Sequence, residues 1–419
     1  MKIVVVGAGI GGLATALSLD AAGFRDIEVY ERADELRGLG VGINLLPHAV
    51  RELTELGIVQ RISTLGVEPT SLAYFNAQGQ PIWSEPRGLA AGYRWPQLSV
   101  HRGRLQLALR DAVLERLGDV IRTGHRLLEV VPGEDADTAR FETAAGVVEV
   151  AADVIVGADG IHSSLRAQHN PEEGAPAWGG LTLWRGVAYA PPFLDGRTMI
   201  MAGHGDQKFV AYPLGEADES GRMRINFIAE KRGAGTASVD WNRAVEIGPI
   251  AELFADWRYD WLDVPALISS AEELLEYPMV DRDPLERWTV GRSTLLGDAA
   301  HAMYPNGSNG GSQAIIDSRV LAFHLGTAAT ASEGLAAYEA DRRPATAALL
   351  AQTREAGPEK VMVLAEQRAP GGFEHIHDVI GADELERVAT DYKKAAGFHP
   401  ALLNERASLT VSRAAEARG

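Results

Sequence analysis

The sequence predicts an α/β fold in which a Rossmann-like dinucleotide-binding domain is interrupted by an inserted mixed-sheet domain and followed by C-terminal helices. Three observations support this prediction. A glycine fingerprint follows a short apolar strand at the N-terminus, strand-like and aromatic segments fall in two separate stretches, and the last part of the chain is rich in alanine. With 419 residues the chain is long enough for two or three domains with buried cores.

The N-terminal segment carries the strand-turn-helix signature of dinucleotide binding. The apolar strand 3–6 leads into Gly7, Gly9 and Gly12, which suit a tight turn, a close approach of a pyrophosphate and close packing of helix on strand. A second strand ends at Glu31, where an acid that binds a ribose hydroxyl is expected, and its charge favours a free 2′-hydroxyl over a 2′-phosphate. The alternative is a glycine-rich turn without a ligand.

The middle of the chain departs twice from the strand-helix-strand pattern. Residues 71–100 alternate in short strand-like pieces broken by glycine and proline, and residues 181–280 are rich in strands and aromatic side chains. Between them, residues 102–117 show helical spacing, and the apolar strand 154–156 runs into an Asp-Gly pair. A second domain inserted twice into the first is the simplest interpretation.

The expected domains are therefore discontinuous. The nucleotide-binding domain is expected to comprise residues 1–70, 101–180 and 281–350, and the inserted domain residues 71–100 and 181–280. Residues 351–419 form a C-terminal helical segment, expected to pack as surface helices or to fray at its end.

A second nucleotide signature lies almost three hundred residues after the first, at 297–317. An apolar run leads into Asp298, and a loop with Gly307, Gly310 and Gly311 then opens a helix. This layout presents one carboxylate and several bare backbone N–H groups to a bulky polar ligand. An NAD-dependent dehydrogenase would use the first signature but would leave the second unexplained.

Composition excludes several classes of partner and site. Forty Lys and Arg against 57 Asp and Glu give a formal charge of −17, which disfavours nucleic acid and anionic membranes. The absence of cysteine excludes disulfides, thiolate metal ligands and a cysteine-linked flavin, and the histidines show no metal-binding spacing. Because the chain starts on a strand and has no long apolar stretch, we expect a soluble, cytoplasmic protein.

Three motifs in this order resemble those of the single-component, class A flavin-dependent aromatic hydroxylases, the para-hydroxybenzoate hydroxylase superfamily. They are the fingerprint at 7–12, the Asp-Gly pair within GADGIHSSLR at 157–166, and GDAAH at 297–301 with Pro305. Shorter stretches, such as GVGIN at 40–44, are similar to the phenazine hydroxylases of pyocyanin synthesis. The resemblance covers residues 1–350.

This resemblance implies a glutathione-reductase-type FAD-binding domain with a substrate domain inserted, non-covalent FAD, and NAD(P)H as a transient co-substrate. Glu31 would bind the adenosine ribose, Arg102 the pyrophosphate and Asp298 a ribityl hydroxyl. The loop 307–311 would turn its N–H groups toward the N1–C2=O edge of the flavin, where negative charge gathers on reduction. The residues expected to bind the cofactor are Gly7, Gly9, Gly12, Glu31, Arg32, Val41, Gly42, Arg102, Leu127, Asp159, Asp298, Gly307, Asn309, Gly310 and Gly311.

The implied reaction is hydroxylation of an aromatic or N-heteroaromatic small molecule by O2 and NAD(P)H through a flavin C4a-hydroperoxide, with or without decarboxylation. A carboxylated, phenazine-like substrate is one possibility. The site must exclude water, because water would let the hydroperoxide decay to hydrogen peroxide. The pocket candidates are Trp184, Arg185, Tyr212, Tyr304 and Pro305. Arg185 suits a substrate carboxylate, and a surface salt bridge is the alternative.

Several alternatives stay open at this point. The chain could be an FAD-binding sensor of aromatic metabolites without turnover, or an FAD oxidoreductase that inserts no oxygen. For Asp159 the alternative is a cap on the following helix, and for His301 a structural role is favoured over proton transfer. No second GxGxxG is present, so NAD(P)H would have to visit transiently. The substrate, the choice between NADH and NADPH, the oligomeric state and the role of the chain after about residue 355 are not predicted.

Overall fold

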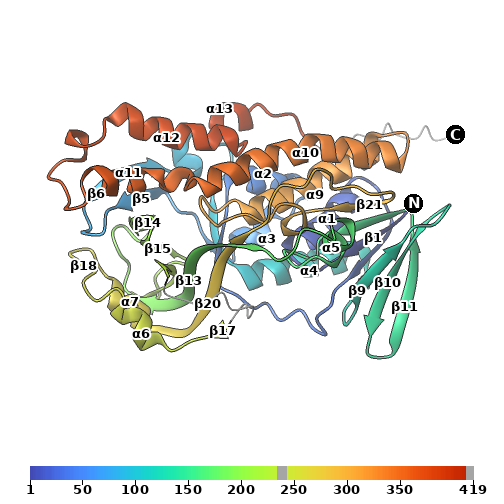
Figure 1. Cartoon of the computed structure of the whole chain (residues 1–419), viewed down its shortest axis with the longest axis horizontal. Coiled ribbons are helices and arrows are strands. Elements are labelled where there is room, and N and C mark those ends of the chain that lie inside the picture. Colours follow the sequence, from blue (N-terminus) through green and yellow to red (C-terminus); the bar gives the residue numbers. More distant parts are fainter. Residues whose placement is uncertain (234–242, 412–419) are drawn as a thin grey trace.

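The computed structural model describes residues 1–233 and 243–411. Residues 234–242 fall in the predicted inserted domain and residues 412–419 in the predicted C-terminal segment, and both lie outside the described residues. Two sheet-centred parts lie side by side, and a row of helices lies along one side of both (Figure 1).

The first part is a five-stranded parallel sheet in the order β21-β12-β1-β2-β8. Its strands are β1 (Lys2–Val6), β2 (Asp26–Tyr30), β8 (Ile121–Arg122), β12 (Val154–Gly157) and β21 (Ser293–Leu295). Helices α1 (Ile10–Ala21), α4 (Arg102–Leu117), α5 (Ser164–His169), α8 (Asp298–His301), α9 (Gly310–Thr327) and α10 (Ala331–Arg354) belong to this part. A parallel sheet of this kind is buried by crossover helices, and the predicted strands and helices around the two nucleotide signatures are confirmed.

A small antiparallel sheet lies beside the first, between α4 and β12. It consists of β9 (Arg126–Val131), β10 (Asp137–Thr143) and β11 (Gly146–Ala152). Phe141 of β10 is fully buried and stacks on Tyr30 at the end of β2, with ring centroids 4.3 Å apart. This contact fixes the small sheet next to the strand that Glu31 follows.

The second part is an eight-stranded mixed sheet in the order β17-β20-β13-β16-β15-β14-β5-β6. Its strands are β5 (Ser71–Phe75), β6 (Pro81–Pro86), β13 (Ala177–Ala190), β14 (Thr198–Gly203), β15 (Gln207–Pro213), β16 (Met223–Arg232), β17 (Arg243–Ala244) and β20 (Ala271–Asp281). Only β5 and β14 pair in parallel within it. A hairpin of β18 (Arg258–Tyr259) and β19 (Leu262–Asp263) and the helices α6 (Ile247–Glu252) and α7 (Val264–Ser269) complete this part.

Each face of the mixed sheet packs on a different element. One face forms an aromatic core with α6 and α7, and the other packs on α11 (Lys360–Arg368). Because successive strand residues point to opposite faces, neighbours in sequence reach different cores. Only one of the two faces is therefore turned toward the first part of the molecule.

A third sheet connects the two parts. It holds β3 (Gly42–Leu45), β4 (Gly66–Val67) and β7 (Leu98–His101), and it lies beside α2 (Pro47–Glu55), α3 (Val59–Ser63) and the 3₁₀ turn η1 (Gly88–Ala91). Residues 98–100, expected in the inserted domain, pair with β3 and β4 rather than with the eight-stranded sheet. We propose that the two domains meet along this sheet and otherwise follow the predicted division.

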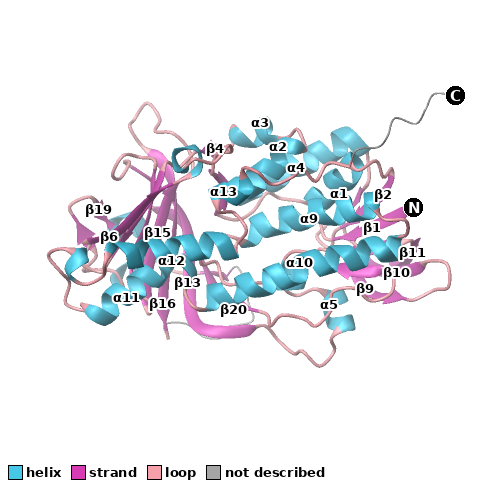
Figure 2. Cartoon of the chain, turned by 90° about the horizontal axis from the view of Figure 1, so that it is seen from above, coloured by secondary structure: helices cyan, strands magenta, loops and turns pink. Residues whose placement is uncertain are grey.

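The chain after residue 355 packs more deeply than surface helices would. It forms the turn η2 (Gly357–Glu359), α11, the turn η3 (Ile376–Asp378), α12 (Ala382–Ala395) and α13 (Pro400–Leu403). Tyr392, Phe398 and Leu403 are at most 3% exposed and form a core with Leu46 and Leu349. From above, α12 lies along the mixed sheet and the end of α10 (Figure 2).

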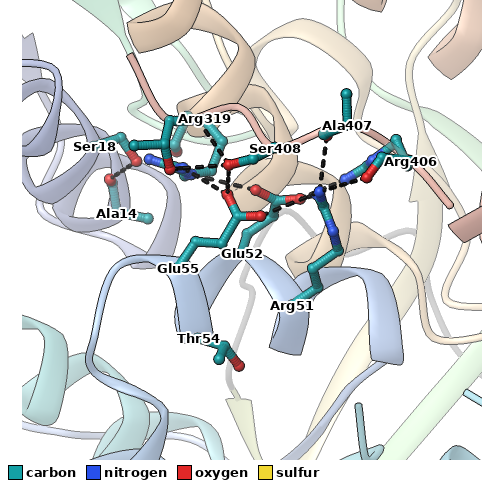
Figure 3. Close-up of polar contacts among 12 residues, drawn as sticks. Ala14, Ser18, Arg51, Glu52, Thr54, Glu55, Arg319, Arg406, Ala407 and Ser408 are labelled. Atoms are coloured by element: carbon teal, nitrogen blue, oxygen red, sulfur yellow. Dashed lines mark hydrogen bonds and ion pairs between the residues drawn. The ribbon is translucent and has the colours of Figure 1, made fainter. Parts of the chain in front are cut away.

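A buried charge cluster ties the end of the described chain to the first part (Figure 3). Glu52 of α2 is fully buried, and its carboxylate accepts hydrogen bonds from Arg51 at 2.5 Å, from Arg319 at 3.2 Å and from Arg406. Glu55 binds Arg319 at 3.0 Å. Removing one partner of such a cluster would leave a buried charge uncompensated. The cluster therefore holds α2, α9 and the segment around Arg406 in fixed positions relative to one another.

The buried histidine of α2 gives the protein a specific acid sensitivity. His48 is fully buried, and burial, together with Arg406 and Arg342, lowers its pKa to about 3. Below pH 6.5 His48 binds a proton in the unfolded chain, whereas its buried ring stays neutral in the native state. The free energy of unfolding therefore falls as pH falls. Between pH 6.5 and 5 this amounts to about 2 kcal/mol. Denaturant unfolding of wild type and His48→Phe at both pH values measures it, and equal losses in the two proteins would contradict it.

Candidate functional site

A cavity of about 330 Å³ lies where the carboxyl ends of three parallel strands face the mixed sheet. Residues 9–11 follow β1, residues 158 and 160 follow β12, and residues 296–298 follow β21. The opposite wall comes from β13, β14, β15 and β16 of the mixed sheet. Open α/β sheets bind ligands outside the carboxyl ends of their strands, so the position itself is that of a binding site.

Two fingerprint glycines shape the turn at the start of α1 without lining the cavity. A side chain on Gly12 would place its Cβ 1.8 Å from the carbonyl oxygen of Gly7, and Gly7 itself has a φ of +103°. Both positions therefore require glycine. Gly9 differs, because a Cβ there would meet nothing within 4 Å, and this residue does line the cavity. The fingerprint thus forms a tight turn with one open, bare backbone face.

Glu31 lies against the same turn. Its Oε2 accepts a hydrogen bond from the backbone N–H of Ala8 at 2.8 Å, and its Oε1 accepts one from Ala33 at 2.9 Å. Neither Glu31 nor the exposed Arg32 lines the cavity. Their placement at the end of β2, beside the glycine turn, is where the sequence predicted a ribose-binding acid.

Asp159 makes the helix-capping contact that the sequence left as its alternative. Its Oδ2 accepts from the backbone N–H of Ser164 at 2.8 Å, while its buried Oδ1 has no partner in the described chain. Burial raises the pKa of this carboxyl, although Ser163 and the helix N–H groups work in the opposite direction. Gly160, which follows it, lines the cavity and has nothing within 4 Å of where a Cβ would lie.

Asp298 and Arg102 present unpaired charges of opposite sign to the cavity, from two different helices. Asp298 is the first residue of α8 and Arg102 the first residue of α4, and both line the cavity and are exposed. Within the part of the chain that the structure describes, neither side chain has a hydrogen bond or ion pair. Unpaired charges of opposite sign along one cavity suit a ligand that carries both hydroxyl donors and phosphate oxygens.

Replacing Arg102 with alanine is expected to weaken binding of the FAD that the sequence predicts about tenfold at low salt, since a charge-assisted hydrogen bond contributes about 1.5–3 kcal/mol. The difference should shrink toward 1 M salt, where the Debye length is about 3 Å. Fluorescence titration of apoprotein with FAD at two salt concentrations measures it. Arg104 is an exposed arginine two residues further along α4 that does not line the cavity, so Arg104→Ala is the control and should bind as wild type does.

The glycine loop forms the floor of the cavity at the start of α9. Asn309, Gly310 and Gly311 line the cavity, and the first N–H groups of a helix have no intrahelical acceptor. A Cβ on Gly310 would lie 3.8 Å from Asp298 Oδ1, so the loop and this carboxylate border the same space. Gly307 does not line the cavity, because it packs on the C-terminal segment.

The mixed sheet contributes the far end of the cavity. Arg185 and Tyr212 of this sheet line it, together with apolar side chains at 201, 210 and 228, and Tyr304 and Pro305 join them from the loop between α8 and α9. Trp184 does not, because it is 1% exposed, lies in the aromatic core on the other face of the sheet and donates to Glu276 at 2.9 Å. Trp184 and Arg185 are consecutive in β13, so only one of them can face the cavity.

Arg185 is held at the rim of this end with hydrogen-bonding capacity to spare. It donates to the carbonyl oxygen of Gly42 at 3.0 Å, and its guanidinium lies 5.8 Å from the centre of the Tyr277 ring. Its buried Nε has no partner among the described residues. Burial raises the pKa of Tyr212 to about 12, against a lowering effect of Arg185, so the Tyr212 hydroxyl stays protonated at neutral pH.

The sequence missed a buried ionic cluster that also borders the cavity. Lys208 pairs with Glu230 at 3.1 Å and with Glu359, and all three are at most 6% exposed as residues. Burial by itself lowers the pKa of Lys208, but the two carboxylates outweigh it and raise this pKa. A second cavity of about 710 Å³ adjoins the first here and shares Glu230, Glu359, Tyr304 and Asn306 with it.

The remaining candidates lie near the cavity but not in its wall. Gly42 lines it, whereas Val41 and Leu127 are buried and do not. His301 is 3% exposed and bonds Asp317 at 2.5 Å. Arg342 binds the same carboxylate at 2.7 Å. Although burial alone would raise it, these partners lower the pKa of Asp317 to about 2. This arrangement supports the structural role favoured for His301.

Taken as a whole, the cavity fits an extended dinucleotide with a planar ring. Bare glycine backbone lines it at both nucleotide signatures, an unpaired arginine and an unpaired aspartate face it, and a buried carboxyl oxygen of Asp159 has no partner in the described chain. Among residues 1–233 and 243–411, no group of three or more His, Asp or Glu could hold a metal ion. No helix in these ranges is both long and apolar enough to cross a membrane.

Comparison with known proteins gives matches over most of the chain. Residues 1–353 match the family model described as an FAD binding domain. The chain is 43% identical over 362 residues to a phenazine 1,6-dicarboxylic acid hydroxylase, PhzS, of Lysobacter antibioticus, covering 84% of this chain and 89% of that protein. It is 31% identical over 336 residues to a 6-hydroxynicotinate 3-monooxygenase of Bordetella bronchiseptica, covering 76% of this chain and 81% of that protein.

Solved structures share the fold. The Klebsiella pneumoniae protein HpxO, crystallised with FAD and uric acid, superimposes with a TM-score of 0.73 at 22% identity, covering 96% of this chain and 98% of that one. A 2,6-dihydroxypyridine-3-hydroxylase from Arthrobacter nicotinovorans superimposes with a TM-score of 0.71 at 23% identity, covering 89% and 94%.

Proposed function

Because the chain belongs to the family of this FAD binding domain and is an FAD-dependent aromatic hydroxylase, we propose that its substrate is a planar N-heteroaromatic carboxylic acid whose carboxylate binds Arg185. The position of Arg185 carries this proposal. It is the arginine on the mixed-sheet side of the cavity, its Nε has no partner among the described residues, and it adjoins the protonated Tyr212 hydroxyl. A guanidinium pairs both oxygens of a carboxylate, and a phenol supplies a further donor.

The proposed placement of FAD follows the two nucleotide signatures. The adenosine ribose would lie at Glu31 with Arg32 beside it, and Val41 and Leu127 would support the adenosine half from behind the cavity wall. The pyrophosphate lies between the Gly7–Gly12 turn, Arg102 and the Asp159-Gly160 pair. The ribityl chain would reach Asp298, and the flavin ring would lie against residues 308–311 and Gly42, next to Pro305 and Tyr304. In this placement Asp298 accepts from a ribityl hydroxyl and the N–H groups of Gly310 and Gly311 face the ring.

When bound, FAD supplies hydride acceptance and oxygen activation. In the proposed reaction, one atom of O2 enters a carbon of the aromatic ring and the other leaves as water. NAD(P)H provides the two electrons and, with one proton from solvent, is oxidised to NAD(P)⁺. The protein holds the ring of the substrate between Tyr304 and the apolar side chains of Met201, Val210 and Ile228, which exclude water from the reacting atoms. Arg185 fixes which ring carbon faces the flavin.

Two features favour a fused ring over a single one. The second cavity adds about 710 Å³ beyond Tyr304, which is space that a single ring does not need. The relative of 43% identity is named for a phenazine dicarboxylic acid, a three-ring N-heteroaromatic. We therefore place phenazine carboxylic acids first among the candidate substrates and single-ring pyridine carboxylic acids second.

Matched pairs of ligands test this proposal. Protein reconstituted with FAD is given NADH or NADPH and either phenazine-1-carboxylic acid or phenazine, and then quinoline-2-carboxylic acid or quinoline. The acids are expected to stimulate NAD(P)H oxidation at least about tenfold more than the uncharged parents, because a charge-assisted pair contributes about 1.5–3 kcal/mol. Mass spectrometry distinguishes a gain of one oxygen from replacement of the carboxyl group. Equal stimulation by acid and parent would rule out carboxylate recognition.

A further inference from the structure

The C-terminal segment reaches the loop on which the flavin ring is proposed to rest. Tyr392 of α12 is 3% exposed, and its hydroxyl accepts a hydrogen bond from Asn309 Nδ2 at 2.7 Å. The same hydroxyl donates to the backbone carbonyl of Asn306 at 3.1 Å. Asn306 and Asn309 lie on either side of Gly307 and Ser308, so one phenol bridges the two ends of the loop.

The ring of Tyr392 also packs directly on the backbone of this loop. Gly307 has a φ of +76°, and a Cβ there would lie 2.0 Å from the Tyr392 hydroxyl oxygen. Glycine is therefore required at this position by Tyr392 as well as by the backbone. The far ends are anchored too, since Asn306 Nδ2 donates to the carbonyl of Thr353 at 2.9 Å and Asn309 Oδ1 accepts from Gln313 at 3.3 Å.

The hydrogen bonds of the Tyr392 hydroxyl do not change with pH near neutrality. Burial raises the pKa of Tyr392, although its bond with Asn309 lowers it in part, so the hydroxyl is protonated and can donate to Asn306. The opposite side of the same loop borders the cavity, which Asn309, Gly310 and Gly311 line. A displacement of the loop toward α12 would therefore change the direction of the N–H groups that face the cavity.

We propose that Tyr392 is a positioning residue, which holds the loop 305–310 so that the N–H groups at the start of α9 point at the N1–C2=O edge of the flavin. This inference rests on the placement of FAD under the proposed function. Negative charge gathers at that edge when the flavin is reduced, and correctly oriented N–H dipoles stabilise it. The tail of the chain thus tunes the reactivity of the flavin from behind the loop, without touching the ring.

The test is the two-electron midpoint potential of FAD in the holoenzyme of Tyr392→Phe. Phenylalanine keeps the packing on Gly307 and removes both hydrogen bonds. We expect oxidised FAD to bind within about twofold of wild type and reduced FAD to bind about tenfold more weakly, which lowers the potential by about 30 mV for a two-electron couple. Tyr259→Phe removes a comparable bond, from a tyrosine hydroxyl to the carbonyl of Ala77 at 3.1 Å, outside both cavities, and should leave the potential unchanged.

A Tyr392→Phe holoenzyme with wild-type potential and lowered thermal stability would overturn the proposal and leave Tyr392 a plain core residue. If this variant does not fold, Tyr392→Met removes the same two hydrogen bonds without changing the cavity wall and should lower the potential in the same way; an unchanged potential there overturns the proposal equally. The potential is measured without substrate. It therefore separates this proposal from the identity of the substrate, which product analysis tests.

Discussion

Asp298→Ala is expected to bind FAD about tenfold to a hundredfold more weakly than wild type while keeping its secondary structure and thermal stability. The carboxylate faces the cavity from the start of α8, and within the described chain it has no partner of its own, so its removal breaks no internal bond. In the proposed site it accepts from a ribityl hydroxyl, and a hydrogen bond to a charged group contributes about 1.5–3 kcal/mol. Fluorescence titration of apoprotein with FAD gives the dissociation constant directly.

Two further variants sharpen this result. Asp298→Asn keeps one acceptor oxygen without the charge, so it should fall between alanine and wild type. Asp260→Ala removes an exposed carboxylate in the turn between β18 and β19 that lines neither cavity, and it should bind FAD as wild type does. An Asp298→Ala protein with wild-type affinity would remove this residue from the cofactor site.

Arg185→Ala is expected to lower kcat/KM for an N-heteroaromatic acid by about tenfold to a hundredfold, with FAD affinity unchanged. The guanidinium is the proposed partner of the substrate carboxylate, and its loss also leaves the Tyr212 hydroxyl without a cationic neighbour. Much of the loss should appear in KM, since the carboxylate is bound equally in the ground state and in the transition state. Steady-state NAD(P)H oxidation with the acid measures both constants.

The side chain of Arg185 has a second effect that can be separated. A substrate bound without its carboxylate contact can turn in the pocket, so we expect a larger fraction of the consumed NAD(P)H to yield hydrogen peroxide. Arg185→Lys keeps the charge but not the planar fork and should recover only part of the loss. Arg258→Ala, an exposed ion-pair arginine on β18, is the matched control. Unchanged kinetics in Arg185→Ala would mean that this residue only supports β3, through its hydrogen bond to the carbonyl oxygen of Gly42.

The sequence predicted those parts of the fold that depend on patterns of neighbouring residues. The strand, the Gly7–Gly12 turn and the helix α1 are contiguous, as are Asp298 and the loop that opens α9, so spacing alone indicated both halves of one cavity. The family model and the relatives confirm the resulting class of enzyme.

What the sequence could not provide depends on contacts between distant residues. Lys208 and Glu359 pair across 151 positions, and Tyr392 reaches Asn309 across 83, so no local spacing indicates either contact. The choice between Trp184 and Arg185 required the orientation of β13, although the alternation of a strand already implied that both could not line one pocket. The tail after residue 355 was predicted to be peripheral from its alanine-rich composition, which does not indicate that Tyr392, Phe398 and Leu403 are buried.

The incorporation of oxygen from isotopically labelled O2 tests the central claim most directly. Protein reconstituted with FAD is incubated with NAD(P)H, ¹⁸O2 and phenazine-1-carboxylic acid, and the product is analysed by mass spectrometry. We predict a hydroxylated product that carries one ¹⁸O atom, formed in proportion to the NAD(P)H consumed. Consumption of NAD(P)H that yields only hydrogen peroxide, with every tested aromatic acid recovered unlabelled, would contradict the account.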